Sequence, residues 1–380
     1  MLESANCPLG FPLMSLLSDG QVVRDTYEVE HSLGEGAFAE VYRVKHRFLG
    51  RQAMKVFKTP GMTVQETEQT LSEAIMLSRI GHPNIIRVFD ANVTDTPIGS
   101  CGFFTMEYVA GGTLEKFWRS HGTSLVPIAT TVEIIRQVCR GLAVGHSESP
   151  PVIHRDIKPQ NILVGYDAAG LRVRVSDFGL AKRVNPLTLL ASARGTRQYK
   201  PPEIFCDSKS DSCAGDVWAV GSILYLLLTD RVAFAFQEGI ELFDRSIFEQ
   251  PPVPPSLLNA HVDPSLERIC LRALALKAGD RYPTSMDLLK DLSNWKPRPV
   301  SALQNVKPLS ADASKSVLGM LTPANEQHGR QLVDQAIGLS KQAGKLGEAA
   351  DLMEEAFNKW PSLRSEREHV LKLWRRGIVT

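Results

Sequence analysis

Hydrophobic and polar residues alternate through the first third of the chain, from about Tyr27 to Tyr108. A period of two residues indicates half-buried β-strands, and it recurs in YEVEHSL, AEVYRVKHR, RQAMKVFK, IIRVFDANV and GFFTMEYV. One segment, TVQETEQTLSEAIMLSRI, instead spaces its apolar residues as an amphipathic helix does. This order of elements predicts a small antiparallel sheet with one helix packed on it.

From Thr113 to about Leu292 the hydrophobic pattern has the helical period. The segment VWAVGSILYLLL is almost entirely apolar, which predicts a buried helix, and it is too short to span a bilayer. VAGG (109–112) is a candidate hinge between the two regions. We therefore predict an α+β fold with a sheet-containing N-terminal lobe (23–108) and a helical C-terminal lobe (113–295).

The two ends of the chain have weaker patterns. Residues 1–22 have no clear period and predict a flexible or loosely docked leader. The proline-rich run KPRPVSALQNVKP breaks the helical pattern and predicts a linker over 296–323. Residues 324–378 predict two or three amphipathic helices.

Within this helical tail, four residues have a spacing similar to the second helix of a tetratricopeptide repeat: Ala349, Met353, Ala356 and Pro361. One such repeat cannot bury its own apolar face, and no second clear copy is present. Two interpretations remain open. The tail is either a helical hairpin that docks on the rest of the chain or on a partner protein, or a plain amphipathic appendage.

Composition excludes several classes of protein. The hydrophobic fraction of 43% and charged fraction of 22% are those of a soluble globular protein. A formal net charge of +1 gives no basic field for nucleic acid. The six cysteines form no C-x-x-C pair, so they indicate reduced thiols rather than a metal site. MLESANCPLG lacks the pattern of a signal peptide, and we expect a cytoplasmic protein without a membrane span.

Three segments carry candidate chemistry. In LGEGAFAEVY the glycines lie between two strands, where a turn without Cβ atoms lets backbone N–H groups approach an anion, although a plain hairpin is the alternative. Lys55 lies on an apolar strand and needs an acidic partner, for which Glu73 on the single helix is the natural candidate. The alternative is an ordinary surface lysine.

The third segment is HRDIKPQN, in which Pro159 prevents a regular helix. Asp156 could accept or orient a proton, and Lys158 could neutralise a transferring anion. Asn161 and the later Asp177 offer oxygen ligands for Mg²⁺, which prefers one or two such ligands together with substrate phosphates. A nucleoside triphosphate would complete this set.

Together these segments resemble a eukaryotic-like serine/threonine protein kinase of the soluble bacterial type, over about Tyr27 to Leu292. The ordered motifs are LGEGAFAEV, AMK, the helix glutamate, MEYVAGG, HRDIKPQN, DFG, GTRQYKPPE, DVWAVG and DRYPT. The resemblance implies a two-lobed protein-kinase fold, ATP and Mg²⁺ as cofactors, and a protein serine or threonine as acceptor. It also implies a phosphotransferase that functions in signalling.

The resemblance implies roles for individual residues. Asp156 and Lys158 would be catalytic, and Asn161 and Asp177 would hold Mg²⁺. Glu203 and Arg281 would form a structural ion pair, with Asp216 bracing the catalytic loop. The residues implied to contact ATP are Leu33, Gly34, Glu35, Gly36, Val41, Ala53, Lys55, Glu73, Met106, Glu107, Val109 and Leu163.

The resemblance also implies a regulatory segment. Arg155 would stay unpaired until a phosphate in the activation segment neutralises it. We expect autophosphorylation at Thr188 or Ser192, upstream of Thr196, whereas packing of the apolar LTLL without a phosphate is the alternative. Two departures from the family pattern are Ala39, in place of a third glycine, and Pro201, in place of an alanine.

Two other functions compete with an active protein kinase. A pseudokinase scaffold would use the helical tail to recruit a partner protein, but such proteins usually lack one of Lys55, Asp156 or Asp177. A small-molecule kinase would usually lack the segment GTRQYKPPE, which this chain has. The sequence does not name the protein substrate or the partner of the tail.

Overall fold

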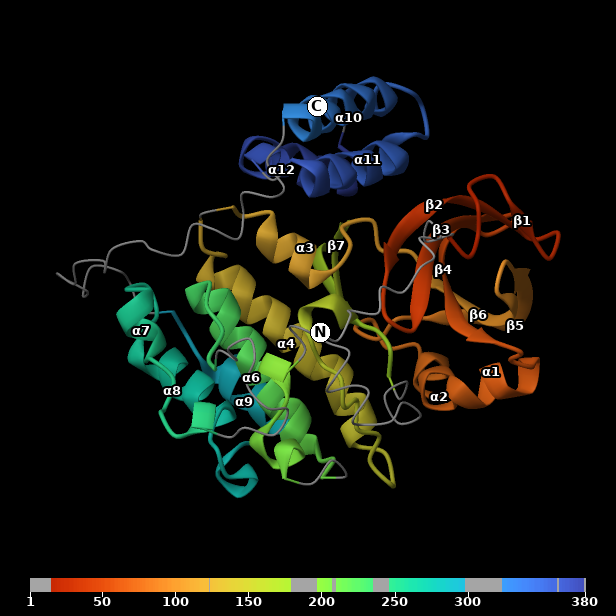
Figure 1. Cartoon of the computed structure of the whole chain (residues 1–380). Helices are drawn as coiled ribbons and strands as arrows, with labels where there is room; N and C mark the ends of the chain where they lie inside the picture. Colours follow the sequence, from red (N-terminus) through yellow and green to blue (C-terminus); the bar gives the residue numbers. More distant parts are fainter. Residues whose placement is uncertain are drawn as a thin grey trace, which may run out of the picture. The chain divides into compact units, whose positions relative to one another are not determined.

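The computed structural model describes residues 15–122, 124–178, 197–206, 210–234, 246–297, 323–360 and 362–378. The chain separates into two compact units. The first comprises residues up to 72 together with 87–108, and the second comprises 73–86 and the residues from 109 onward. Figure 1 labels the elements of both units.

The first unit contains an antiparallel sheet of six strands in the order β1-β2-β3-β4-β6-β5. These strands are β1 (Val22–Val23), β2 (Tyr27–Glu35), β3 (Ala39–His46), β4 (Gly50–Pro60), β5 (Val88–Thr96) and β6 (Gly99–Glu107). Alternate residues such as Tyr42 and Val44 on β3 are buried, as the period of two residues predicts. The predicted antiparallel sheet is therefore confirmed.

The single helix expected beside this sheet is interrupted. Helix α1 (Val64–Thr70) begins at Thr63, which forms a capping box with Glu66. It ends at Leu71, whose backbone (φ −95°, ψ 3°) leaves the helical ladder, and α2 (Ser72–Ile80) follows. The apolar period runs through both helices, so it gave no sign of the break.

Part of the expected flexible leader is packed against the sheet. Leu16 and Leu17 are buried in the core cluster of the first unit. Their backbone N–H groups donate to Glu40 Oε2 (2.9 Å) and to Tyr42 Oη (3.0 Å). The prediction of a loosely held leader is thus wrong for residues 15–22, because two consecutive leucines are too short a signal for a period. Residues 1–14 lie outside the described residues.

The second unit is mostly helical and contains a two-stranded ribbon, β7 (Ile162–Asp167) and β8 (Gly170–Val175). Its other helices, besides α2, are α3 (Leu114–Arg119), α4 (Ile128–His146), α6 (Cys213–Thr229), α7 (Pro255–Leu258), α8 (Pro264–Ala273), α9 (Ser285–Asn294), α10 (Pro323–Ser340), α11 (Leu346–Lys359) and α12 (Ser362–Arg375). The nearly apolar α6 packs against α4, α8 and α9, as its composition predicts (Figure 1).

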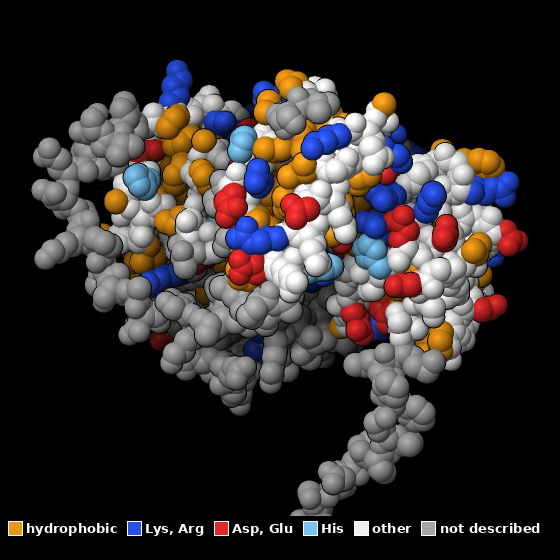
Figure 2. Space-filling view, turned by 90° about the horizontal axis from the view of Figure 1, so that it is seen from above, with side chains coloured by type: hydrophobic (Ala, Val, Ile, Leu, Met, Phe, Trp, Pro, Cys, Tyr) orange, Lys and Arg blue, Asp and Glu red, His pale blue; other side chains and the backbone are white. Residues whose placement is uncertain are grey.

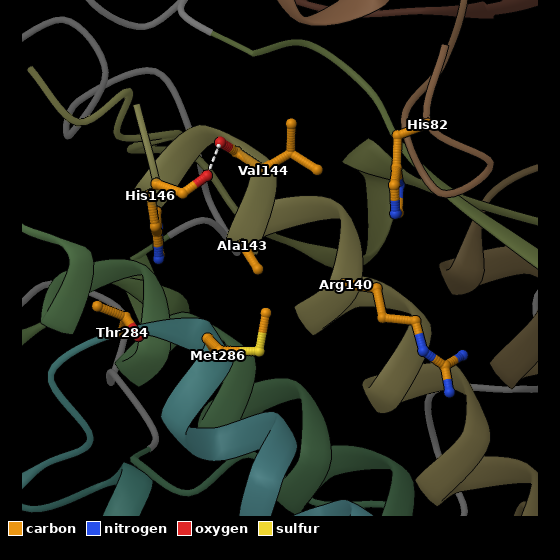
Figure 3. Close-up of a pocket in the computed structure, with 8 residues that line it drawn as sticks. His82, Arg140, Ala143, Val144, His146, Thr284 and Met286 are labelled. Atoms are coloured by element: carbon orange, nitrogen blue, oxygen red, sulfur yellow. Dashed lines mark hydrogen bonds between the residues drawn. The ribbon is translucent and has the colours of Figure 1, made fainter. Parts of the chain in front are cut away.

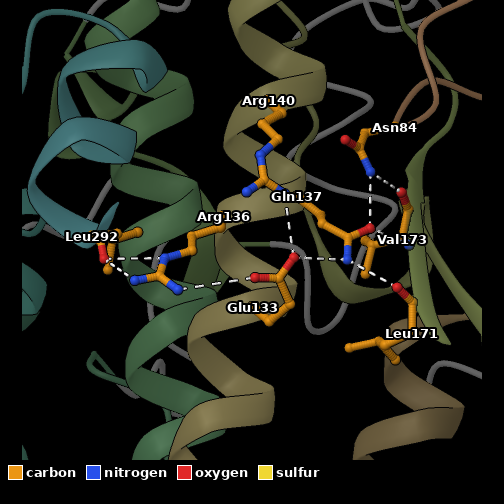
Figure 4. Close-up of polar contacts among 8 residues, drawn as sticks. All are labelled: Asn84, Glu133, Arg136, Gln137, Arg140, Leu171, Val173 and Leu292. Carbon is orange, nitrogen blue, oxygen red and sulfur yellow. Dashed lines mark hydrogen bonds and ion pairs between the residues drawn. The ribbon is translucent and has the colours of Figure 1, made fainter. Parts of the chain in front are cut away.

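Residues 73–86 group with the second unit although the sequence places them in the first lobe. The reason is a polar network around Gln137 of α4, drawn in Figure 4. Asn84 Nδ2 donates to Gln137 Oε1 (2.9 Å) and to Val173 O (2.8 Å). Gln137 Oε1 also accepts from Val173 N (2.9 Å). One side chain of α4 therefore joins the residues after α2 to strand β8.

No helix among the described residues is long and apolar enough to cross a membrane. In the space-filling view of Figure 2, Lys and Arg side chains are interspersed with Asp and Glu. This mixed surface agrees with the formal net charge of +1.

The described part of the tail forms three helices with a core of their own. Ala349, Met353 and Ala356 of α11 are fully buried in it, together with Phe357. Helices α10 and α11 approach closely at Gly329, where an added Cβ would lie 2.8 Å from Trp360 Cβ. The predicted helices of the tail are present, and the missing Cβ of Gly329 permits this close approach.

The tail docks on the helical part of the same unit. Tyr166 Oη on β7 donates to Glu368 Oε1 (2.6 Å). The guanidinium of Arg364 lies 4.8 Å from the ring centroid of Phe117 on α3. An added Cβ at Gly111 would lie 2.6 Å from Glu354 Oε2. Helices α11 and α12 thus cover the segment that follows β6 and the outer side of β7.

Glu354 makes the docking of the tail on the rest of the second unit sensitive to pH. Its side chain is 1% exposed, Oε1 accepts from Arg375 (3.3 Å), and Oε2 has no hydrogen-bond partner within the described residues. Burial raises the pKa of Glu354 to about 7, against the opposing effect of Arg375. The carboxyl group therefore gains a proton on folding between its ordinary pKa of 4.5 and about 7. Its contribution to stability is present below this window and is lost as pH rises through it.

We predict that E354Q removes this loss, because the amide has nearly the same shape and stays neutral. The melting temperature of E354Q should exceed that of the wild-type protein by at least about 2 °C at pH 8 and should match it near pH 5. Thermal unfolding followed by circular dichroism measures both values. E326Q, which changes an exposed carboxylate on α10, is the control without a pH-dependent difference. An equal dependence on pH in E354Q and wild type would contradict the prediction.

Candidate active site

One face of the first unit carries several of the predicted ATP-contacting residues. The register pairs Gly34 with Val41, Val41 with Lys55, and Ala53 with Met106. Residues paired across antiparallel strands, and residues two apart on one strand, share a face. Val41, Ala53, Lys55 and Met106 therefore point to the same side of the sheet. Leu33, Glu35 and Glu107 lie at the ends of β2 and β6, and Gly36 lies in the turn after β2.

In the second unit, Asp156 is held by three side chains. Lys158 Nζ lies 2.7 Å from Asp156 Oδ2, and Lys200 Nζ lies 3.1 Å from Oδ1. Asn161 Nδ2 donates to the backbone oxygen of Asp156 (2.8 Å) and to Oδ2 (3.1 Å). Burial acts to raise the pKa of Asp156, but the two ammonium groups more than offset it and hold that pKa well below its ordinary range. Asp156 is thus a carboxylate at neutral pH.

The backbone around Asp156 is fixed by the buried carboxylate of Asp216 on α6. Asp216 Oδ2 accepts from His154 N (2.8 Å), and Oδ1 accepts from Arg155 N (3.0 Å). His146 Nε2 lies 3.0 Å from Oδ2. Because Ser285 N donates to His146 Nδ1 (3.2 Å), Nε2 carries the imidazole proton and donates to Asp216. The bracing role expected for Asp216 is therefore present in the structure.

Two residues of this region have left-handed backbone conformations that side chains rarely adopt: Arg155 (φ 68°) and Asp177 (φ 65°). Such strain persists only where surrounding contacts impose it, and it clusters at functional sites. Here His154 connects the two strained positions, because its Nε2 bonds Ser176 O (2.7 Å) and its ring lies 4.7 Å from that of Phe178. The strain points to a site that spans both segments.

Asn161 and Asp177 are the two predicted ligands of Mg²⁺, and both lie next to the paired strands β7 and β8. Ser176 N donates to Asn161 O (2.9 Å), and the next residues, Ile162 on β7 and Val175 on β8, are paired. The backbone of Asp177, which follows Ser176, therefore lies near that of Asn161. The Nδ2 branch of Asn161 is turned to Asp156, so its other branch presents the carbonyl oxygen Oδ1. Asp177 Oδ1 is buried. An amide oxygen and a carboxylate suit a hard cation such as Mg²⁺, and these residues fit that group.

Leu163 and Val109 are brought together in the second unit. Leu163 on β7 forms an isolated bridge with Thr113, and Val164 N donates to Gly112 O (2.8 Å). Val109 lies over the same strand, since an added Cβ at Gly165 would lie 3.0 Å from Val109 Cγ1. The candidate hinge is thus attached to β7, the strand that follows the segment HRDIKPQN.

Arg155 has acidic partners in this structure. Its Nε donates to Asp211 Oδ2 (2.6 Å), and one terminal nitrogen lies 3.6 Å from Glu73 Oε2. The resemblance implied that Arg155 stays unpaired until a phosphate neutralises it, whereas here it is paired with two carboxylates. Sequence gave no signal for Asp211, because it lies far along the chain in a loop before α6. Lys55 belongs to the first unit and Glu73 to the second, so their expected pairing stays a prediction.

Some expected residues cannot be placed. Thr188, Ser192 and Thr196 lie outside the described residues. The described cysteines form no disulfide. Within the described residues no cluster of three His, Cys, Asp or Glu side chains that could hold a metal ion is present.

A cavity of about 380 Å³ also lies in the second unit, beside α4. Figure 3 shows His82 and Arg140 on one side of it and Thr284 and Met286 on the other. Its lining residues are His82, Arg140, Ala143, Val144, His146, Ser147, Thr284 and Met286. None of these is a predicted site residue, although His146 also contacts Asp216.

The ion pair expected between Glu203 and Arg281 is confirmed. The guanidinium donates to both carboxylate oxygens of Glu203 at 2.7 Å, and its Nε donates to Ala275 O (2.7 Å). It also lies 4.8 Å from the ring centroid of Trp218. With its side chain 0% exposed, Arg281 fastens the segment before α6 to the helical core.

Comparison with known proteins identifies the family. The sequence model of the protein kinase domain matches residues 27–372, and the chain therefore belongs to the protein kinase family. The matches confirm a serine/threonine protein kinase domain with relatives in bacteria. The two-lobed α+β fold predicted from sequence is confirmed with it.

Three relatives illustrate the similarity. Serine/threonine-protein kinase PknB of Mycolicibacterium smegmatis is 33% identical over 284 residues, which cover 72% of this chain and 43% of PknB. A probable serine/threonine-protein kinase of Clostridium acetobutylicum is 30% identical, covering 73% of this chain and 41% of that protein. The solved PknI kinase domain of Mycobacterium tuberculosis superimposes with a TM-score of 0.53 at 22% identity, covering 73% of this chain and 98% of that domain. The chain thus spans less than half the length of these two curated relatives.

The Glu203–Arg281 pair generates a test of stability. R281M should lower the free energy of unfolding by about 3 kcal/mol, because it leaves a carboxylate without its partner and removes a buried charge network. Urea unfolding measures the change. R272M is the matched control: Arg272 is about half exposed, and its loss should cost about 1 kcal/mol or less. Equal effects of the two substitutions would show that the buried pair has no special role.

Proposed function

We propose that this chain is an ATP- and Mg²⁺-dependent kinase that phosphorylates serine and threonine hydroxyls of protein substrates in the cytoplasm. The observation that carries the proposal is the environment of Asp156, whose carboxylate is held ionised by Lys158 and Lys200 and oriented by Asn161. A positioned acceptor of a hydroxyl proton beside a cation is what phosphoryl transfer requires from a protein.

Each residue has a distinct task in this mechanism. Asp156 orients the acceptor hydroxyl and takes its proton as the acceptor oxygen bonds the γ-phosphorus. The bond from that phosphorus to the bridging oxygen breaks, and ADP leaves with the electron pair. Lys158 neutralises charge on the moving phosphoryl group. Mg²⁺, when bound, would neutralise the phosphates of ATP, and Asn161 and Asp177 are the residues that would hold it. Most of the rate enhancement then comes from positioning and charge stabilisation.

The face of the first unit with Val41, Ala53, Lys55 and Met106 supports nucleotide binding. Ala53 and Met106 are nearly buried, whereas the charged Lys55 stands between Val41 and Phe104 in the register. Apolar side chains suit the adenine base and a lysine suits its phosphates. We assign the remaining predicted contacts of the first unit, Leu33, Gly34, Glu35, Gly36 and Glu107, to the same nucleotide site. The contacts expected of Glu73, Val109 and Leu163 in the second unit stay predictions.

The decisive test is D156N. It should lower kcat by about 10²- to 10⁴-fold, because the amide cannot accept the proton, while ATP affinity stays nearly unchanged. Transfer from labelled ATP to a generic protein substrate measures kcat, and calorimetry measures the affinity. D167N is the control: Asp167 is an exposed carboxylate paired with Arg172, and its substitution should keep full activity. If the wild-type protein binds ATP without transferring phosphate, the alternative of a pseudokinase scaffold gains support.

We further propose autophosphorylation at Thr188 or Ser192. A phosphate on either residue would compete with Asp211 for the guanidinium of Arg155. Phosphopeptide mapping of active protein by mass spectrometry should find phosphate on one of these residues, and D156N protein should lack it. Active wild-type protein without phosphate at either position would contradict the proposal and favour packing of the apolar LTLL.

We also propose that residues 324–378 form a module similar to a tetratricopeptide repeat, joined to the kinase domain (23–295) by the linker 296–323. The buried Ala349, Met353 and Ala356 support the repeat-like spacing. A protein partner for this module stays a proposal as well.

A further inference from the structure

Lys200 is a residue of the site that the sequence did not single out. It lies in a bend between two short 3₁₀ turns, η3 (Arg197–Tyr199) and η4 (Pro202–Phe205), and is 9% exposed. Its ammonium donates to Arg155 O (2.7 Å) and to Asp156 Oδ1 (3.1 Å). A buried lysine is costly unless it is paired, and here the pairing is with the proposed catalytic carboxylate.

The two oxygens of Asp156 are not equivalent. Oδ2 accepts from both Lys158 (2.7 Å) and Asn161 (3.1 Å), whereas Lys200 is the single donor to Oδ1 among the described residues. A carboxylate oxygen has about two lone-pair sites. Oδ2 is therefore saturated, and an incoming hydroxyl finds its remaining acceptor site on Oδ1. The acceptor hydroxyl and the Lys200 ammonium would then share one oxygen atom.

The backbone that carries Lys200 is restricted. Pro201 disfavours helical conformations of the residue before it, and Pro202 has its own fixed φ. Glu203 follows at once and is clamped by both terminal nitrogens of Arg281. Pro201, which departs from the family pattern, thus has a physical role. It helps to hold the Lys200 ammonium against Asp156.

We propose that Lys200 is a positioning residue for the phosphoryl-transfer site, which fixes Asp156 Oδ1 for the acceptor hydroxyl and places a second ammonium beside the transferred group. This inference rests on the proposed kinase function and deepens it. Lys158 acts on one oxygen of the carboxylate and Lys200 on the other, so neither lysine replaces the other.

The kinetic test compares K200M with K200R. K200M should lower kcat by about 10- to 100-fold, because charge stabilisation at the transition state is lost, and should leave KM for ATP within about twofold. K200R, which keeps a cation, should recover part of kcat. K290M, a change at an exposed lysine on α9, is the matched control and should behave as wild type. An unchanged kcat in K200M would overturn the proposal.

The split between kcat and KM separates positioning from a structural role. A fold defect would change kcat and the KM for ATP together and would not be rescued by K200R. That outcome would overturn the proposal.

A measurement that does not depend on catalytic activity distinguishes failure of the Lys200 proposal from failure of the kinase proposal. The carboxyl signal of Asp156 can be followed by carbon NMR in aspartate-labelled protein and assigned by its absence in D156N. At neutral pH its chemical shift should change in K200M, because the ammonium group that contacts Oδ1 is lost, and should keep its wild-type value in K290M. An unchanged chemical shift in K200M would overturn the role of Lys200. Loss of phosphate transfer in the wild-type protein, with the chemical shift changed as expected in K200M, would instead overturn the kinase proposal alone.

Discussion

The interaction on which the site depends is the burial of the Asp216 carboxylate in α6. This carboxylate accepts hydrogen bonds from the backbone N–H groups of His154 and Arg155 and from the imidazole of His146. Hydrogen bonds to a charged, desolvated acceptor are stronger than neutral ones, and leaving the acceptor without them would be costly. The left-handed backbone of Arg155 is therefore held in place, and Asp156 is presented from a fixed position.

Charge compensation around Asp156 follows from this rigidity. Several ionised groups lie close together, and each has a partner: Lys158 and Lys200 with Asp156, and Arg155 with Asp211 and Glu73. The ammonium groups keep Asp156 ionised without a titration near neutral pH. These contacts also make Arg155 sensitive to a new anion nearby, because that anion would compete with the carboxylates of Asp211 and Glu73 for the guanidinium.

The sequence predicted the parts that depend on local pattern. Alternation gave the sheet, the apolar run gave α6, and the ordered motifs gave Asp156, Lys158, Asn161 and Asp177. It did not predict the parts that depend on tertiary contact. Lys200 lies within GTRQYKPPE and Asp211 in no motif, and neither was singled out, because their contacts arise only when distant segments meet. Two leucines of the leader were missed for the same reason, since their burial depends on Glu40 and Tyr42.

The close contact at Gly111 has a consequence for how this protein can vary. A side chain there would meet Val164 O at 2.2 Å as well as Glu354 Oε2, so two neighbours exclude it independently. Shortening Glu354 alone would not make the position tolerant, and neither would loss of the whole tail. The sequence of the tail can therefore diverge while position 111 stays restricted to glycine, whereas a side chain at Gly111 would disturb both β7 and the docking of α11.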